Sequence, residues 1–393
     1  MANIKQVVLN TTELKDFVKH IVGNNRYLQE NGKNPVAINI EGEAGLGKTS
    51  AILQVAEELN LQCIKLNLSQ LEEIGDLVGF PMKEHEMIKG ELTKWVTEST
   101  MPMYITSGYK PTGEKRMTHA APEWVQGKGQ GGILILDDWT RADLRFVQAV
   151  MEIIDRQEYI SWKLPKDWHV ILTSNPDNGE YLVNSIDTAQ RTRFITAHLK
   201  FDIDCWAKWA EQNNVDSRCI NFLLMHPELV KGDINPRSIT TFFNSISSIK
   251  VFEEQLPLIQ MIGEGSVGTE FSTLFTTFIN NKLDTMVSPK EILTGADWDP
   301  IETKLKASMY EGTHYRADIA SLMATRISNY SVVYAESNPV TDKILDRIKD
   351  IIKAEGLFAL DLHYFMIKNI ISGNKTKFQK MLLDKDIVKL AVK

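Results

Sequence analysis

The chain has 393 residues, of which 43% are hydrophobic and 24% charged, and its formal net charge is −7. This composition is typical of a globular protein of two or three domains, and the negative charge excludes a global attraction to nucleic acid or to anionic membranes. Three separated cysteines, Cys63, Cys205 and Cys219, form no CxxC pair, which argues against a disulfide framework or a cysteine zinc site. The first twenty residues lack a signal-peptide core, and no apolar run approaches the roughly 18–20 residues of a membrane span, so we expect a cytoplasmic protein.

Short β-type runs alternate with helical patterns between about residues 35 and 200. The runs are "VAINI", "CIKLNL", "GILIL", "HVILTS" and "FITAHL". Continuous Val, Ile and Leu strands that alternate with helices are typical of a parallel sheet covered on both faces. The sequence therefore predicts an α/β domain over residues 1–200.

The stretch "EGEAGLGKTS" directly follows the first of these runs and fits G-x-x-x-x-G-K-[ST], the Walker A pattern. Glycines let successive backbone N–H groups turn toward phosphate oxygens, the lysine reaches the β and γ phosphates, and the hydroxyl that follows can bind magnesium. A helical pattern begins at the lysine, and its dipole adds to the phosphate site. The predicted phosphate-binding residues are Gly42, Glu43, Ala44, Gly45, Leu46, Gly47, Lys48, Thr49 and Ser50.

The third of these runs, within "GGILILDDW", is followed by two acids, Asp137 and Asp138. We expect Asp137 to organise the magnesium ion, as in a Walker B motif, together with Thr49. Asp138 stands where many ATPases have a glutamate that polarises the attacking water. An aspartate is one methylene shorter, which affects the expected rate of hydrolysis more than nucleotide binding.

The run "HVILTSNP" ends in Ser174 and Asn175. An asparagine before a proline is a turn former on its own. After a phosphate loop and an acidic strand end, we interpret Asn175 as a polar side chain that senses the γ-phosphate.

Helical periodicity dominates after Lys200, in "DIDCWAKWAEQNN", "SRCINFLLMHPELV" and "PRSITTFFNSISSI". We expect a helical lid over 201–260 and a helical C-terminal region over 261–393. Trp206 and Trp209 are three residues apart, a spacing that favours a place in the lid core.

The order of these motifs resembles the AAA+ ATPases, and within them the MoxR-like branch, over about residues 35–245. The segment "LDDWTRADLRFVQAVMEIIDRQEYI" is similar to the segment that follows the magnesium aspartate in that branch, and "DTAQRTRF" is similar to its arginine-finger stretch. The resemblance implies Arg193 as the finger, Arg191 as a further candidate, and Arg237 in "NPRSITTFF" as the second sensor. The segment 83–117 is longer than the family minimum and has no expected role.

A guanidinium beside the γ-phosphate stabilises the charge that develops in the transition state. In this fold the finger lies away from its own phosphate loop, so we expect Arg193 to act on the neighbouring subunit. The resemblance further implies Mg²⁺-dependent ATP hydrolysis by a ring, in most cases a hexamer, and chaperone-like remodelling of a protein partner with a von Willebrand factor A domain.

Two alternatives come from other classes: a nucleic-acid motor or loader, and a slowly hydrolysing, nucleotide-gated scaffold. The net charge and the lack of a basic, aromatic-rich stretch count against the motor, whereas Asp138 motivates the scaffold. A GTPase interpretation rests on "NKLD" at 281–284, but guanine recognition needs this motif after an apolar strand, and the preceding residues have helical spacing.

Overall fold

A computed structural model describes residues 7–126, 128–129, 131–280, 286–354 and 356–392. The "NKLD" motif therefore lies outside the described residues. The chain divides into two compact units, Met1–Lys200 and Phe201–Lys393. The division coincides with the expected end of the α/β domain.

The first unit is built on a six-stranded parallel sheet in the order β1-β11-β2-β10-β7-β3. Its strands are β1 (Val7–Leu9), β2 (Ala37–Glu41), β3 (Gln62–Asn67), β7 (Gly132–Asp137), β10 (Trp168–Ser174) and β11 (Phe194–Leu199). All five apolar runs form strands of this sheet, as predicted. Because β10 lies between β2 and β7, the carboxyl ends of these three strands meet at one edge.

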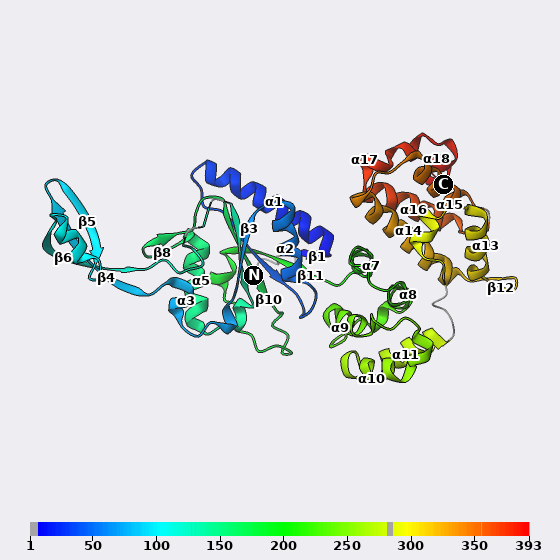
Figure 1. Cartoon of the computed structure of the whole chain (residues 1–393), viewed down its shortest axis with the longest axis horizontal. Helices are drawn as coiled ribbons and strands as arrows, with labels where there is room; N and C mark the ends of the chain where they lie inside the picture. The colour runs from blue at the N-terminus through cyan, green and yellow to red at the C-terminus, as the bar shows by residue number, and fades with distance from the viewer. Residues whose placement is uncertain (1–6, 127, 130, 281–285, 355, 393) are drawn as a thin grey trace. The chain divides into compact units, whose positions relative to one another are not determined.

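Helices cover both faces of the sheet (Figure 1). Side chains of α1 (Thr11–Glu30) and α2 (Lys48–Glu58) share a core with Ile38, Ile135 and Ile171. Side chains of α3 (Ile74–Val78) and α5 (Leu144–Arg156) pack with Leu134 and Leu172 from the opposite face. Neighbouring strand residues alternate between the two cores, and this explains why the strands are apolar throughout. The αβα architecture of a P-loop NTPase is confirmed.

The long segment around residues 83–117 forms a separate three-stranded antiparallel sheet in the order β5-β4-β6. It consists of β4 (Pro81–Lys89), β5 (Leu92–Thr97), α4 (Met101–Thr106) and β6 (Lys110–His119). At its base, the Ser161 hydroxyl donates to the His119 carbonyl and accepts from the His119 N–H. Ser161 lies between the two short strands β8 (Glu158–Tyr159) and β9 (Trp162–Lys163), so these two hydrogen bonds connect the β5-β4-β6 sheet to the β8–β9 hairpin.

The second unit is helical. Its first hydrophobic core joins α7 (Ile203–Gln212), α8 (Ser217–Met225), α9 (Pro236–Ile246), α10 (Leu256–Ser266) and α11 (Gly268–Asn280). Trp206 is 6% exposed within it, and Trp209 packs against it, as expected. Residue 260 lies inside α10, and this core continues to Ile279, so the first group of helices extends about twenty residues beyond the expected boundary.

A second core holds the remaining helices together. They are α12 (Pro289–Thr294), α13 (Trp298–Met309), α14 (Ala317–Ser337), α15 (Asp342–Lys353), α16 (Leu360–Gly373), α17 (Lys375–Phe378) and α18 (Lys385–Val392). A short hairpin of β12 (Tyr310–Glu311) and β13 (His314–Tyr315) follows α13. Among the described residues, no helix is both long and apolar enough to cross a bilayer.

Candidate functional site

The segment 42–47 forms a glycine-dependent loop between β2 and α2, as the sequence predicts. Gly45 and Gly47 have φ values of +79° and +85°, a region that glycine adopts without steric cost. Helix α2 begins at Lys48, so its first unpaired N–H groups and its positive dipole end lie at the loop. This geometry is the one that binds phosphate at helix N-termini.

Lys48 is 8% exposed, and its ammonium group is held inside the loop. Lys48 Nζ donates to the carbonyls of Gly42 at 2.6 Å and Glu43 at 3.0 Å, and to Asn175 Oδ1 at 3.0 Å. The contact with Asn175 joins the ends of β2 and β10. Lys48 and Asn175, which lie 127 positions apart in the sequence, are thus joined by a direct hydrogen bond.

Asp137, at the end of β7, accepts hydrogen bonds from two hydroxyl groups and a lysine. Thr49 Oγ1 lies 2.7 Å and Thr173 Oγ1 2.6 Å from Asp137 Oδ1, and Lys65 Nζ lies 2.9 Å from Asp137 Oδ2. Burial alone would raise the pKa of Asp137, but these hydrogen bonds outweigh it and hold the pKa below its ordinary value. Asp137 is therefore ionised over the whole physiological pH range.

Thr49 and Asp137 fit a magnesium ion by their chemistry. A hydroxyl and an ionised carboxylate are hard oxygen ligands, and their oxygens are already adjacent. No group of three or more His, Cys, Asp or Glu residues gathers in the part of the chain that the structure describes. A pair of this kind suits Mg²⁺, which retains waters and phosphate oxygens as ligands and needs few from the protein.

Asp138 lies beside Asn175 at the same edge. Its N–H donates to Thr173 Oγ1 at 3.1 Å, and Asn175 Nδ2 donates to Asp138 Oδ1 at 3.4 Å. Asp138 has a φ of +52°, in the left-handed region that non-glycine residues seldom adopt. Because the hydrogen bonds hold this conformation, the carboxylate has a fixed direction next to Asn175.

Arg193 and Arg191 lie at the other end of the sheet. Phe194 pairs with Ala37, the first residue of β2, whereas the phosphate loop follows the last residue of β2. Five strand residues at about 3.3 Å each separate the two ends by about 16 Å. Arg191 is exposed at the end of α6 (Thr188–Arg191), and Arg193 lies two residues beyond it, next to β11. The structure does not bring either arginine to the phosphate loop of its own chain.

Arg237 belongs to the second unit and occupies the first turn of α9. Asn235 caps this helix, since its side chain accepts from the N–H groups of Arg237 and Ser238. The side chain of Arg237 is exposed.

Three further side chains of the site were not predicted: Thr173 and Asn39 are buried, and Lys65 is exposed. Lys65 and Thr173 bind Asp137, and Asn39, in the middle of β2, accepts from Trp139 Nε1 and Ser174 Oγ. A sequence signal existed for Asn39 and Thr173, because each is a polar residue in a mostly apolar, buried strand, whereas Lys65 lies in the more exposed strand β3. A polar residue in a fully buried strand needs a partner, but the sequence does not say which.

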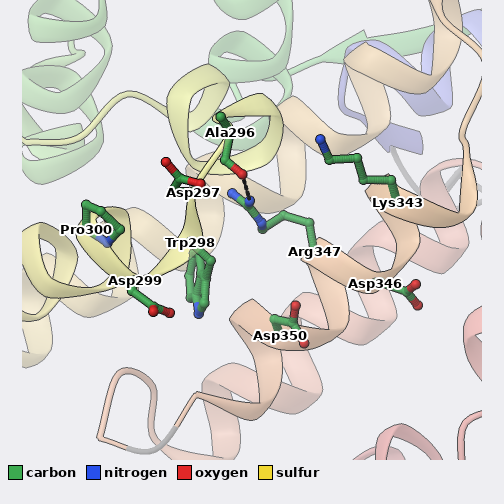
Figure 2. A pocket seen from close by; sticks show the side chains of 9 residues that line it. All are labelled: Ala296, Asp297, Trp298, Asp299, Pro300, Lys343, Asp346, Arg347 and Asp350. Carbon is green, nitrogen blue, oxygen red and sulfur yellow. Dashed lines mark hydrogen bonds between the residues drawn. The ribbon is translucent and has the colours of Figure 1, made fainter.

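The second unit contains a pocket of about 790 Å³ between the start of α13 and α15 (Figure 2). Four aspartates and Arg347 are among the residues that line it. The Arg347 guanidinium donates to the carbonyls of Ile292 and Gly295 at 3.0 Å each and lies 5.3 Å from the Trp298 ring centre. Arg347 therefore holds α15 against the end of α12, a structural role.

The parallel sheet, the glycine loop and the side chains at the ends of β2, β7 and β10 together have the architecture of a P-loop NTPase. No protein-family model matches the chain, and no curated protein matches it in sequence. The RuvB Holliday junction branch migration motor of Thermotoga maritima is similar at 16% identity, over 71% of this chain and 74% of that chain, with a TM-score of 0.35. A variant of the same motor has 13% sequence identity, over 75% of this chain and 86% of that chain, with a TM-score of 0.37. A proposed ATPase from Cytophaga hutchinsonii has 14% sequence identity, over 91% of this chain and 96% of that chain, with a TM-score of 0.30. Likenesses this weak do not bear on the function of this chain.

Proposed function

We propose that this chain binds and hydrolyses ATP with Mg²⁺ as a ring-forming AAA+ ATPase of MoxR-like type. The observation that carries the proposal is that Asp137 and Asn175, from the ends of β7 and β10, bond to Thr49 and Lys48 directly after the glycine loop. The sequence predicts each residue separately, and a glycine-rich turn without a ligand would not require them to meet.

Each residue has a distinct task in this proposal. The loop N–H groups and Lys48 bind the phosphates, and Thr49 with Asp137 holds the magnesium ion, which neutralises charge on the phosphate oxygens. Asp138 accepts a proton from, or orients, the attacking water, and Asn175 fixes the direction of the Asp138 carboxylate. Because Asn175 also contacts Lys48, it would respond to the terminal phosphate.

A ring is the expected catalytic unit. The position of Arg193 at the opposite end of the sheet from its own loop supports a role at the nucleotide of a neighbouring subunit. Arg237 would contact the phosphates of its own subunit from the lid. A hexamer and a protein partner with a von Willebrand factor A domain complete the proposal, and both follow from the MoxR resemblance alone.

One observation favours a second candidate, a scaffold that binds ATP and hydrolyses it slowly. Asp138 reaches less far than a glutamate, and its Oδ1 already accepts from Asn175. The two candidates share the binding site and differ only in turnover.

The proposal is tested by titrating wild type and Lys48→Ala with fluorescent ATP and GTP analogues. We expect the variant to lose about tenfold or more in ATP affinity, because a hydrogen-bonded charge on phosphate contributes about 1.5–3 kcal/mol. Lys33→Ala, which changes an exposed lysine in the same unit, is the matched control. Equal ATP affinity in wild type and Lys48→Ala, or a strong preference for GTP, would refute the proposal. ATP turnover that a protein partner stimulates indicates a remodeller, and turnover that DNA stimulates indicates a nucleic-acid motor. Turnover that neither stimulates indicates a scaffold.

A further inference from the structure

Tyr181 contacts the phosphate loop from a segment to which no role has been assigned. The segment 176–186 connects the end of β10 to α6, and the Ala44 N–H donates to the Tyr181 hydroxyl at 3.2 Å. This loop N–H therefore bonds to a side chain 137 residues away in the sequence. A tyrosine hydroxyl is both an acceptor and a donor, and among the described residues the Tyr181 hydroxyl is seen only as an acceptor, from the Ala44 N–H.

The position of this hydroxyl relates it to Lys48. Glu43 C=O and Ala44 N–H belong to one peptide group, whose oxygen accepts from Lys48 Nζ and whose nitrogen donates to Tyr181. The Tyr181 hydroxyl and the Lys48 ammonium thus bind the two edges of the same peptide. Since the lysine of a phosphate loop reaches the β and γ phosphates, this peptide lies at the terminal-phosphate end of the loop.

The segment is anchored independently of Tyr181. The Asn184 N–H donates to the Thr140 carbonyl at 2.7 Å, and Asn184 Nδ2 donates to the Ala142 carbonyl at 2.7 Å. Both carbonyls belong to the turn that follows Asp138. Tyr181 is therefore held between the end of β7 and the loop, which lowers the entropic cost of using its hydroxyl in binding.

We propose that Tyr181 is a further residue of the nucleotide site, which holds the Ala44 N–H and donates its own proton to an oxygen of the terminal phosphate. This inference rests on the proposed function. It assigns to Tyr181 the discrimination of nucleoside triphosphate from diphosphate, because only the triphosphate places an acceptor at that end of the loop. A hydrogen bond to a charged oxygen is about twice as strong as one between neutral groups.

The test is a comparison of two ligands on the full chain with Mg²⁺, by calorimetric titration with ADP and with a non-hydrolysable ATP analogue. Tyr181→Phe keeps the ring and removes the hydroxyl. We expect its affinity for the ATP analogue to fall about tenfold and its affinity for ADP to change by less than about twofold. Tyr27→Phe, at a 62% exposed position on α1, is the matched control and should leave both affinities unchanged.

Asn184→Ala provides a second variant, because it loosens the anchor without touching the loop. It should shift the ratio of the two affinities in the same direction but less, and it carries the test if Tyr181→Phe does not fold. If Tyr181→Phe loses the same factor of affinity for ADP and for the ATP analogue, or loses affinity for neither, the role of Tyr181 is overturned. Wild type that binds neither nucleotide, or Lys48→Ala that binds both as wild type does, would instead refute the proposed function.

Discussion

Arg193 and Asp155 form an ion pair at the end of the sheet opposite the phosphate loop. Arg193 Nε lies 2.6 Å from Asp155 Oδ2, and Arg193 Nη1 donates to the Ala189 carbonyl at 2.9 Å. Asp155 is on the last turn of α5, the helix that follows Asp138 along the chain. The ion pair therefore fixes the direction of the Arg193 guanidinium, which remains partly exposed, at this end of the sheet.

A mixing experiment tests whether Arg193 acts on the neighbouring subunit. Arg193→Ala and Lys48→Ala should each be nearly inactive as ATPases, since an arginine finger contributes about 10³–10⁵ in rate. Mixing the two variants should restore part of the activity, because some interfaces would combine an intact loop with an intact finger. The measurement is steady-state phosphate release, with light scattering to follow assembly.

Arg191→Ala in the same assay decides which of the two arginines carries the role. Arg145→Ala changes an exposed arginine that pairs with Asp143 and should leave activity unaltered. If mixed rings form and remain inactive, Arg193 is not a finger that acts between subunits.

Asp138 should control hydrolysis and not binding. Asp138→Asn should bind ATP with wild-type affinity and lose turnover, because an amide cannot accept the proton of water. Asp138→Glu should hydrolyse at least as fast as wild type, since the longer side chain reaches the usual position of the carboxylate. Binding and phosphate release are measured on the same samples, with the exposed Asp177→Asn as control. Normal hydrolysis by Asp138→Asn would place the catalytic carboxylate elsewhere.

Thr173→Val should make stability depend less on the ionisation of Asp137. The pKa of Asp137 is lower in the folded protein than in the unfolded chain, so the ionised carboxylate stabilises the folded state. This contribution to the free energy of unfolding is complete above the unfolded pKa of about 3.9, and it is lost as the pH falls through the lower pKa of the folded protein. Removal of the Thr173 hydroxyl raises the folded pKa toward that of the unfolded chain.

Urea unfolding of wild type and Thr173→Val checks this prediction. The variant should be less stable by about 1–2 kcal/mol at neutral pH, because it loses a hydrogen bond to a charged group. The difference should shrink below about pH 4, where the carboxylate becomes protonated. A difference in unfolding free energy that stays constant with pH would show that Thr173 acts through packing alone.

The buried Arg326 joins the two helical groups of the second unit. Its side chain is 1% exposed, and it donates to Glu211 Oε1, Asn221 Oδ1 and Ser217 from α14 across to α7 and α8. Arg326→Ala should destabilise this unit by about 3–5 kcal/mol, because it leaves the charge of Glu211 buried without its partner. Chemical unfolding followed by tryptophan fluorescence measures the loss.

The double variant Arg326→Met/Glu211→Met separates charge from packing. It should recover much of the stability, since apolar side chains of similar volume replace a buried ion pair at little cost. Arg316→Ala, from the more exposed pair with Asp318, should cost less than about 1 kcal/mol. A double variant as unstable as Arg326→Ala would assign the loss to shape and not to charge.

The amino-acid sequence by itself determined the local parts of this protein. Five apolar runs became five of the six strands of one parallel sheet, and the glycine pattern of residues 42–47 became a loop that ends at Lys48. Both depend on neighbours along the chain: strand period, glycine freedom and the start of a helix are short-range properties.

Tertiary structure alone decided which side chains meet. The pairing of Lys48 with Asn175, of Asp137 with Lys65 and Thr173, and of Ala44 with Tyr181 depends on the strand order, in which β10 lies between β2 and β7. The first helical core extends to Ile279 because α10 and α11 pack into it. Helical periodicity in the sequence shows that these helices have an apolar face, but it does not show which of the two cores that face joins. Contacts between residues that are distant in the sequence are set by the burial of whole faces, and no local pattern encodes them.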